Sequence, residues 1–176
     1  MTRTLTLVAV LALTAAVSLM AAENLRIVPL VHDPQVLVSV EMNDAYNDEV
    51  KDTIASGLRV TFTYDVQLRM VIAGWVDRTV ATVVVNVSDQ YDNLTRRHSL
   101  SRTIDGRTDD AAVTEDEAVV KQWLTTLTRL PICETLELER NRDYYVRVSA
   151  RKRPQQTFPF GWANSVTSQA KFTFVP

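Results

Sequence analysis

The segment from Leu58 to Met70, LRVTFTYDVQLRM, alternates apolar and polar residues without a break. A period of two places all the apolar side chains on one face, which is typical of a β-strand with one buried side. These apolar residues are Leu58, Val60, Phe62, Tyr64, Val66, Leu68 and Met70. At about 3.3 Å per residue such a strand would span roughly 43 Å. We therefore expect it to bend or to contain a β-bulge.

Similar alternation elsewhere predicts that most of the chain is antiparallel β-structure. The segment AGWVD, residues 73–77, is expected to connect the long strand to a returning strand over residues 79–91. A turn at Asp92 and Asn93 leads into a polar segment over residues 94–104, which is typical of an edge strand. Further strands are predicted over residues 36–42, 143–151 and 170–174.

Two segments have the features of amphipathic helices. The first covers residues 43–57, with Asn43 as N-cap and Gly57 just past the end. The second covers residues 114–131, where Thr114 and Glu117 form a capping box and Pro131 ends the helix. Its apolar stripe consists of Val119, Val120, Trp123, Leu124, Leu127 and Leu130. The predicted fold class is mostly β or α+β, an antiparallel sheet or sandwich with a long central hairpin and two covering helices.

The N-terminus has the features of a secretory signal peptide. Arg3 precedes an uncharged stretch from Leu5 to Met20, and small residues follow. We predict a signal over residues 1–22 and a single β-rich domain over residues 23–176, exported to the periplasm or the extracellular space. Cleavage after Ala22 would leave Met20 at a position that prefers a small residue. An uncleaved signal that tethers the protein to the membrane therefore remains an alternative.

The residue inventory argues against most catalytic and cofactor chemistry. Two histidines and one cysteine, without helical His spacing or a CxxC pair, are too few for a zinc site. The acidic segment DGRTDDAAVTEDE, residues 105–117, lacks the spacing of a calcium loop and is interpreted as a solvated loop. No Walker loop, glycine-rich fingerprint or GxSxG motif is present. We expect no metal, no cofactor and no catalytic residues, and a net charge of -2 gives no reason to expect nucleic-acid binding.

Cys133 is expected to be a small buried hydrophobic residue, because a single cysteine cannot form an internal disulfide. An intermolecular bridge or a reactive thiol is the alternative.

Basic residues cluster at two places. Arg96, Arg97, His98 and Arg102 lie on one predicted strand, and Arg147, Arg151, Lys152 and Arg153 lie at the end of another. If the two strands are close together, the clusters form one cationic surface for an acidic partner or phosphate head groups. The alternative is that these charges protect sheet edges from unwanted pairing.

The segment RKRPQQTFPFGWANS, residues 151–165, contains three large aromatic residues without a regular pattern. They either fold back to cap an open end of the core or form an exposed aromatic patch beside basic residues. Such a patch suits a membrane surface or a protein partner. Our predicted partner-binding site consists of Phe158, Phe160, Trp162, Arg151, Lys152 and Arg153.

Several motifs together resemble a bacterial exported family known as domain of unknown function 4390. They are SGLRVTFTYDVQL, GWVDRTVA, YDNLTRRHSLSR, EAVVKQWLTTL, YYVRVSAR and the closing AKFTF. Their order and spacing carry the resemblance, which spans most of residues 23–176. It implies an exported β-rich domain and brings no activity, cofactor or site residue with it.

We expect a non-enzymatic envelope protein that binds another protein, as an adaptor or interaction module, or that acts beside one at the membrane. A carrier that encloses an apolar or lipid ligand is the first alternative. A hydrolase that uses carboxylates without a recognisable motif is the second, with Asp65 and Asp77 as eligible as any others.

Overall fold

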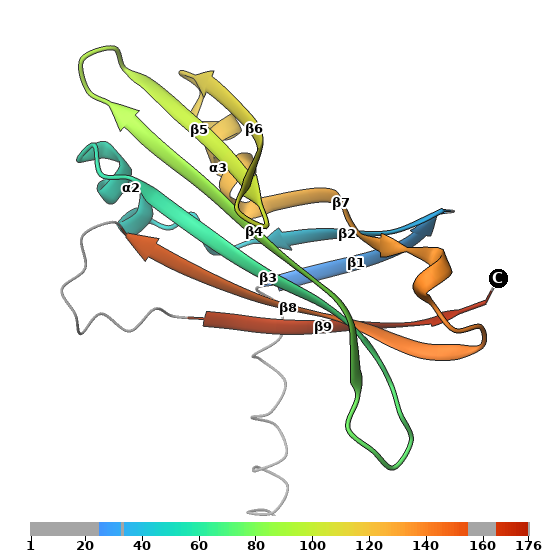
Figure 1. Cartoon of the computed structure of the whole chain (residues 1–176). Helices are drawn as coiled ribbons and strands as arrows, with labels where there is room; N and C mark the ends of the chain where they lie inside the picture. Colours follow the sequence, from blue (N-terminus) through green and yellow to red (C-terminus); the bar gives the residue numbers. More distant parts are fainter. Residues whose placement is uncertain (1–24, 33, 155–164, 176) are drawn as a thin grey trace, which may run out of the picture.

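The computed structural model describes residues 25–32, 34–154 and 165–175 of the 176-residue chain. Nine strands and three short helices are seen in these ranges, and Figure 1 shows their arrangement. In chain order they are β1 (Leu25–His32), β2 (Gln35–Met42), α2 (Asp48–Ala55), β3 (Val60–Met70), β4 (Arg78–Asp92), β5 (Arg97–Ile104), β6 (Arg107–Thr114), α3 (Glu117–Thr125), β7 (Thr126–Glu134), the 3-10 helix η2 (Thr135–Glu137), β8 (Arg142–Pro154) and β9 (Ser165–Phe174).

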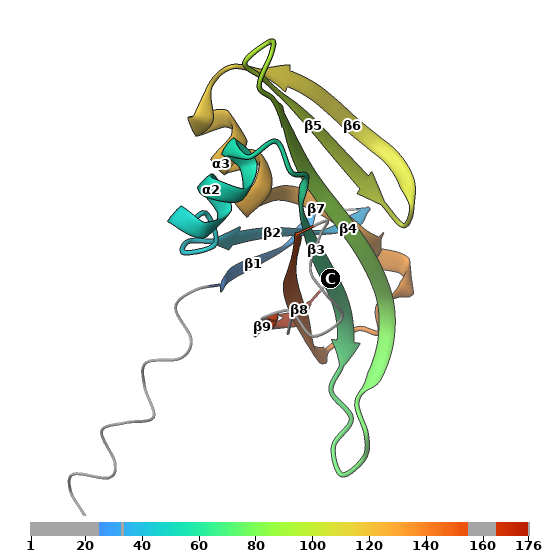
Figure 2. The ribbon, with the colours of Figure 1, turned by 90° about the vertical axis from the view of Figure 1, so that its left-hand side faces the viewer.

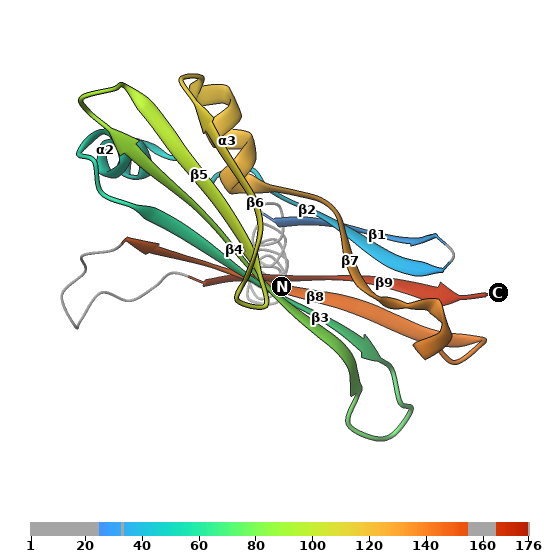
Figure 3. The same ribbon diagram turned by 45° about the horizontal axis from the view of Figure 1, so that its top comes forward.

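The strands form two antiparallel sheets. The larger sheet has the strand order β6-β5-β4-β3-β8-β9, and the smaller has the order β1-β2-β7. Strand β1 lies next to β9 where the two sheets approach each other (Figure 3). Helices α2 and α3 lie on the same side of the larger sheet as the smaller sheet does (Figure 2). The predicted mostly-β or α+β class with two helices is confirmed.

Strand β3 is the centre of the larger sheet and confirms the strongest sequence prediction. Every second residue from Val60 to Met70 is buried, and the residues between them are partly exposed. The strand pairs with β4 on one side and with β8 on the other. The expected irregularity is a register shift between Leu68 and Arg69 in the pairing with β4. One face of β3 therefore contributes to the core, and the other forms the middle of an outer polar face.

The first helix is shorter than predicted. It begins at Asp48, with Asn47 rather than Asn43 as its N-cap, because the Asn47 side-chain oxygen accepts a hydrogen bond from the Val50 N–H at 3.1 Å. The predicted end is confirmed, since Gly57 follows the helix with a φ of 80°.

The second helix is about half as long as predicted. Helix α3 ends at Thr125, and the remaining residues up to Glu134 form strand β7. The predicted cap Thr114 is also wrong, because the Asp116 side chain accepts the hydrogen bond from the Ala118 N–H at 2.8 Å. Residues 126–134 pair with β2, where Leu130 lies opposite Val38. Sheet pairing and burial outweigh helix propensity here, and Pro131 is tolerated because β7 is an edge strand.

Two further strands were not predicted. Residues 107–114 of the supposed solvated loop form β6, which pairs with β5 across a turn at Asp105 and Gly106. Strand β5 is therefore not the edge strand that the sequence indicated. Strand β1 pairs with β2 along its whole length although its sequence has no clear alternation.

The space between the sheets is filled by apolar side chains. The largest that are fully buried include Tyr64, Tyr144, Phe62 and Leu124. The Tyr64 hydroxyl donates a hydrogen bond of 2.6 Å to the Leu124 carbonyl oxygen and so ties the larger sheet to α3. Cys133 is half-buried against this core, and burial, reinforced by the nearby Glu137 carboxylate, raises the pKa of its thiol to about 11. The thiol is therefore protonated at neutral pH.

Replacing Gly57 with Ala should lower the free energy of unfolding by about 1–2 kcal/mol, because a Cβ disfavours the left-handed backbone conformation. A Cβ there would also lie 3.1 Å from the Asn93 side-chain nitrogen. Gly74→Ala is the matched control, since Gly74 has a φ of 74° and no atom within 4 Å of the added carbon. Urea denaturation should show a larger loss at position 57 than at position 74. Equal losses would show that the Asn93 contact has no effect.

Candidate interaction surface

The structure places two of the predicted site residues on β8, where both are half-buried. The Arg151 guanidinium lies 4.0 Å from an Asp65 carboxylate oxygen on β3, and the Lys152 ammonium lies 2.8 Å from the Glu49 carboxylate on α2. Each cation therefore already has an acidic neighbour within the domain.

The side chains of the remaining predicted site residues are not described. Phe158, Phe160 and Trp162 lie outside the described residues. The backbone of Arg153 pairs with Thr61, and its side chain is not described. The aromatic patch therefore remains a prediction.

The two basic clusters do not form one surface. Strand β5 is separated from β8 by β4 and β3, so the sheet order keeps the clusters apart. His98 is buried, and the Arg102 guanidinium lies 4.5 Å from the centre of the Trp123 ring on α3. The condition for a joint cationic surface, that the two strands lie close together, is therefore not met.

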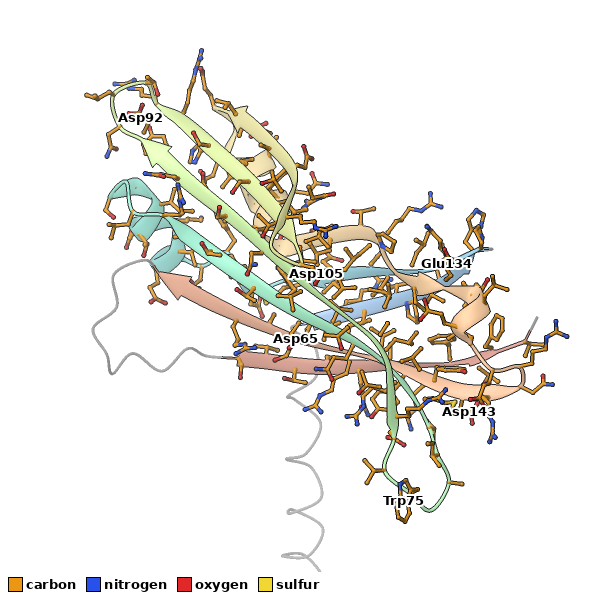
Figure 4. All side chains as sticks on the ribbon, viewed as in Figure 1. Asp65, Trp75, Asp92, Asp105, Glu134 and Asp143 are labelled. Atoms are coloured by element: carbon orange, nitrogen blue, oxygen red, sulfur yellow. The ribbon has the colours of Figure 1, made fainter. Side chains whose placement is uncertain are left out.

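The connection between β3 and β4 carries the most exposed large aromatic residue among those described. Trp75 is 79% exposed and its neighbour Val76 is 73% exposed. The hairpin extends beyond the rest of the larger sheet, with Trp75 at its tip (Figure 4). The sequence prediction of a connection at residues 73–77 is confirmed. The sequence did not indicate that its tryptophan would point away from the core.

The side chain and carbonyl of Asp77 brace this hairpin. One carboxylate oxygen accepts a hydrogen bond from the Tyr145 hydroxyl at 2.9 Å, and the other accepts one from the Ile72 N–H at 3.3 Å. The Asp77 carbonyl accepts a third from the Arg69 guanidinium at 2.9 Å. Burial, together with the hydrogen bond to Asp77, raises the pKa of Tyr145, so its hydroxyl remains a donor at neutral pH.

The outer face of the larger sheet is a ladder of polar side chains. Across β3, β4 and β5, the Thr63 hydroxyl donates to the Asn86 amide oxygen at 2.8 Å, and the Asn86 nitrogen donates to Thr103 at 3.3 Å. Over β3 and β8 the face is hollowed into a cleft of about 240 Å³ lined by Asp65, Gln67, Arg147 and Ser149. The polar positions of β3, which alternation assigned to solvent, therefore form a surface with its own hydrogen-bonding groups.

A buried acid–base pair lies at the other end of the sheet, near α2 and α3. The His98 Nδ1 atom and an Asp89 carboxylate oxygen are 2.9 Å apart, and Asp89 is fully buried. Burial raises the pKa of the Asp89 carboxyl, and the hydrogen bond and charge of His98 oppose this shift. The Tyr91 ring packs against His98 with 4.6 Å between ring centres. The sequence offered no signal that linked His98 to Asp89.

Two features are absent from the described residues. Within residues 25–32, 34–154 and 165–175, no three His, Cys, Asp or Glu side chains lie close enough together to hold a metal ion. In the same ranges no helix is both long enough and apolar enough to cross a membrane.

Comparison with known proteins connects the chain to one family. The family model described as domain of unknown function (DUF4390) matches residues 20–157. Neither the curated proteins nor the solved structures contain a significant match. Because the matched segment covers well over half of the chain and includes β1 to β8, the chain belongs to the DUF4390 family.

Proposed function

We propose that this protein is exported to the bacterial envelope and works there as a non-enzymatic interaction module that binds another protein. Residues 1–22 support export through their signal-like sequence. The lack of cofactor and catalytic motifs in the sequence supports a binding role rather than a catalytic one.

The observation that carries the proposal is the exposed Trp75 on a braced hairpin. Tryptophan is strongly enriched among the residues that dominate binding energy at protein interfaces. An ordered hairpin already holds the tryptophan in place, so less conformational entropy is lost when a partner binds. The three hydrogen bonds to Asp77 supply that order before any partner arrives.

The two alternatives have less support from the described residues. A carrier needs room for its ligand, and the space between the two sheets is occupied by large side chains such as Phe62 and Tyr144. A hydrolase needs free carboxylates at a cleft. Of the two candidates, Asp65 accepts a hydrogen bond of 3.2 Å from Gln67, and both carboxylate oxygens of Asp77 are used to brace the hairpin.

Site-specific photo-crosslinking from position 75 in living bacterial cells tests the proposal. We expect a discrete protein adduct, identified by mass spectrometry. Position 113 is the matched control, because Val113 is also an exposed apolar residue, at 65%, and lies on β6, away from the hairpin. The proposal would be contradicted by lipid adducts alone, by the absence of an adduct at position 75, or by the same adducts from both positions.

Trp75→Ala should then weaken binding of the crosslinked partner by about 30-fold or more, which corresponds to the roughly 2 kcal/mol expected of a dominant interface residue. The free energy of unfolding should change by less than about 0.5 kcal/mol, because the side chain is exposed. Trp75→Phe should retain part of the affinity. Purified partner and variants can be compared by calorimetry, and an unchanged affinity would remove Trp75 from the interface.

A further inference from the structure

The cleft on the outer face is built from two adjacent strands. Gln67 on β3 lies opposite Arg147 on β8, and Asp65 lies opposite Ser149 in the same register. The cleft has a volume of about 240 Å³. This room suits one polar side chain and is smaller than the roughly 300–1,000 Å³ of typical small-molecule pockets.

In the cleft, Asp65 already has polar partners, whereas Arg147 has none among the described residues. Asp65 accepts a hydrogen bond of 3.2 Å from the Gln67 amide and lies 4.0 Å from the Arg151 guanidinium. Arg147 is exposed and has no hydrogen-bond or ion-pair partner within residues 25–32, 34–154 and 165–175. The cleft therefore presents a free guanidinium beside a carboxylate that its neighbours partly neutralise.

A second free cation borders the cleft. Lys171 on β9 lies opposite Tyr145, one outward-facing position along β8 from Arg147. It is exposed and, like Arg147, forms no ion pair with any described residue. Two cations at this place therefore have no ion-pair partner among the described residues, and the Ser149 hydroxyl beside them accepts a hydrogen bond of 3.2 Å from the Thr167 hydroxyl. This surplus of positive charge is complementary to an acidic ligand.

We propose that this cleft binds a carboxylate side chain of an acidic segment in the protein partner, with Arg147 as the main recognition residue. A guanidinium fork holds a carboxylate through two parallel hydrogen bonds, which gives both strength and a fixed orientation. The proposal rests on the proposed function, because it assigns the chemistry of the partner's contact segment.

The position of the cleft suits a partner that also contacts the hairpin tip. Asp65 lies in the middle of the sheet and Trp75 at the tip of the same β-hairpin (Figure 4). Between them along β3 lies Arg69, whose guanidinium is 6.0 Å from the centre of the Tyr145 ring. One partner surface can therefore bury Trp75 and place an acidic segment across β3 and β8.

A fluorescent peptide of ten glutamates is the probe, titrated with the full-length protein and followed by fluorescence anisotropy at low salt. Arg147→Gln should weaken binding about tenfold. A hydrogen bond to a charged group contributes at least about 1.4 kcal/mol, which corresponds to a tenfold change in affinity. Arg107→Gln, on the distant strand β6, is the matched control and should leave the affinity unchanged. Carbodiimide, which couples carboxylates directly to amines, should join the peptide to Lys171.

Three results would overturn the inference. One is that the peptide fails to bind. Another is that Arg147→Gln binds it as well as the unaltered protein does. The third is that coupling occurs at lysines other than Lys171. A sulfated oligosaccharide or phosphatidylglycerol vesicles that bind through Arg147 while the peptide does not would also overturn it, because the ligand would then not be a protein segment.

The test separates this inference from the proposed function. Trp75→Ala should leave the glutamate peptide's affinity unchanged, because the peptide needs only the cleft. If position 75 yields no protein adduct in cells but the peptide still binds through Arg147, the proposed role of the hairpin is rejected and the proposed role of the cleft is retained. If adducts form at position 75 and the peptide does not bind, the cleft fails alone.

Discussion

Tyr64→Ala should lower the free energy of unfolding by about 3–5 kcal/mol, the range for removing a large buried aromatic side chain. Tyr64 is 0% exposed and lies in the middle of β3, where its hydroxyl donates the 2.6 Å hydrogen bond to the Leu124 carbonyl at the end of α3. The substitution leaves a cavity between the sheet and the helix and also removes the bond that joins them. Chemical denaturation followed by circular dichroism measures the loss.

Two controls divide this effect into its parts. Tyr64→Phe keeps the ring and removes only the hydroxyl, so it should cost about 0.5–1.5 kcal/mol, the net value of one hydrogen bond. Thr61→Ala changes an outward-facing residue of the same strand and should cost far less than Tyr64→Ala. A loss at Tyr64→Ala as small as that at Thr61→Ala would mean that the sheet and α3 are not packed as described.

Asp89→Ala should lower the free energy of unfolding by about 1–3 kcal/mol, because it leaves the buried His98 ring without its partner. The His98–Asp89 contact of 2.9 Å lies where β4 and β5 pair. A double-mutant cycle with His98→Ala measures the coupling between the two side chains. Additive losses would show that the contact contributes nothing to stability.

The same carboxyl makes stability depend on pH. Burial raises the pKa of Asp89 above its ordinary value of 3.8, so the folded chain holds this proton more tightly than the unfolded chain does. The part of the stability that is linked to this proton is therefore complete below pH 3.8 and is lost as the pH rises through the higher folded pKa. The titratable groups nearby include His98, with the Tyr91 ring packed against it, and Tyr46, with the Glu117 carboxylate beside it.

Asp89→Asn removes the ionisation and keeps a polar side chain in the same place. Its free energy of unfolding should rise relative to that of the unaltered protein as the pH increases above 3.8, and the difference should become constant once Asp89 is fully ionised. Urea denaturation between about pH 3.5 and pH 7 measures the difference. A difference that falls with pH would mean that His98 lowers the pKa of Asp89 more than burial raises it.

Local sequence was enough wherever one period repeated over a whole strand. The alternation at residues 58–70 predicted the buried face of β3, and the similar pattern at residues 79–91 predicted β4. In β3 every inward-facing residue is a buried apolar side chain, so the pattern and the fold agree. In β4 the alternation has one exception, because the inward-facing Asp89 contacts His98. Gly57 was likewise predictable, because a residue with a φ of 80° after a helix is most easily a glycine.

The tertiary structure decided the elements whose partners are far away in the sequence. Residues 126–134 have the apolar spacing of a helix but become β7, because β2, about ninety residues earlier, offers a sheet edge to pair with. Strand β6 contains acidic and small residues that favour a loop, and its pairing with β5 overrides that preference.

The same distinction applies to the features of the candidate surface. The sequence determined that residues 73–77 connect two strands and that the outward side of β3 is polar. It could not determine that Trp75 is exposed or that Asp77 braces the hairpin. Nor could it determine that Arg147 has no partner among the described residues while Arg151 lies beside Asp65. Periodicity indicates which face of a strand is buried. The exposure of a loop residue and the pairing of charges depend instead on which strands become neighbours. Those neighbours are determined only when the two sheets assemble.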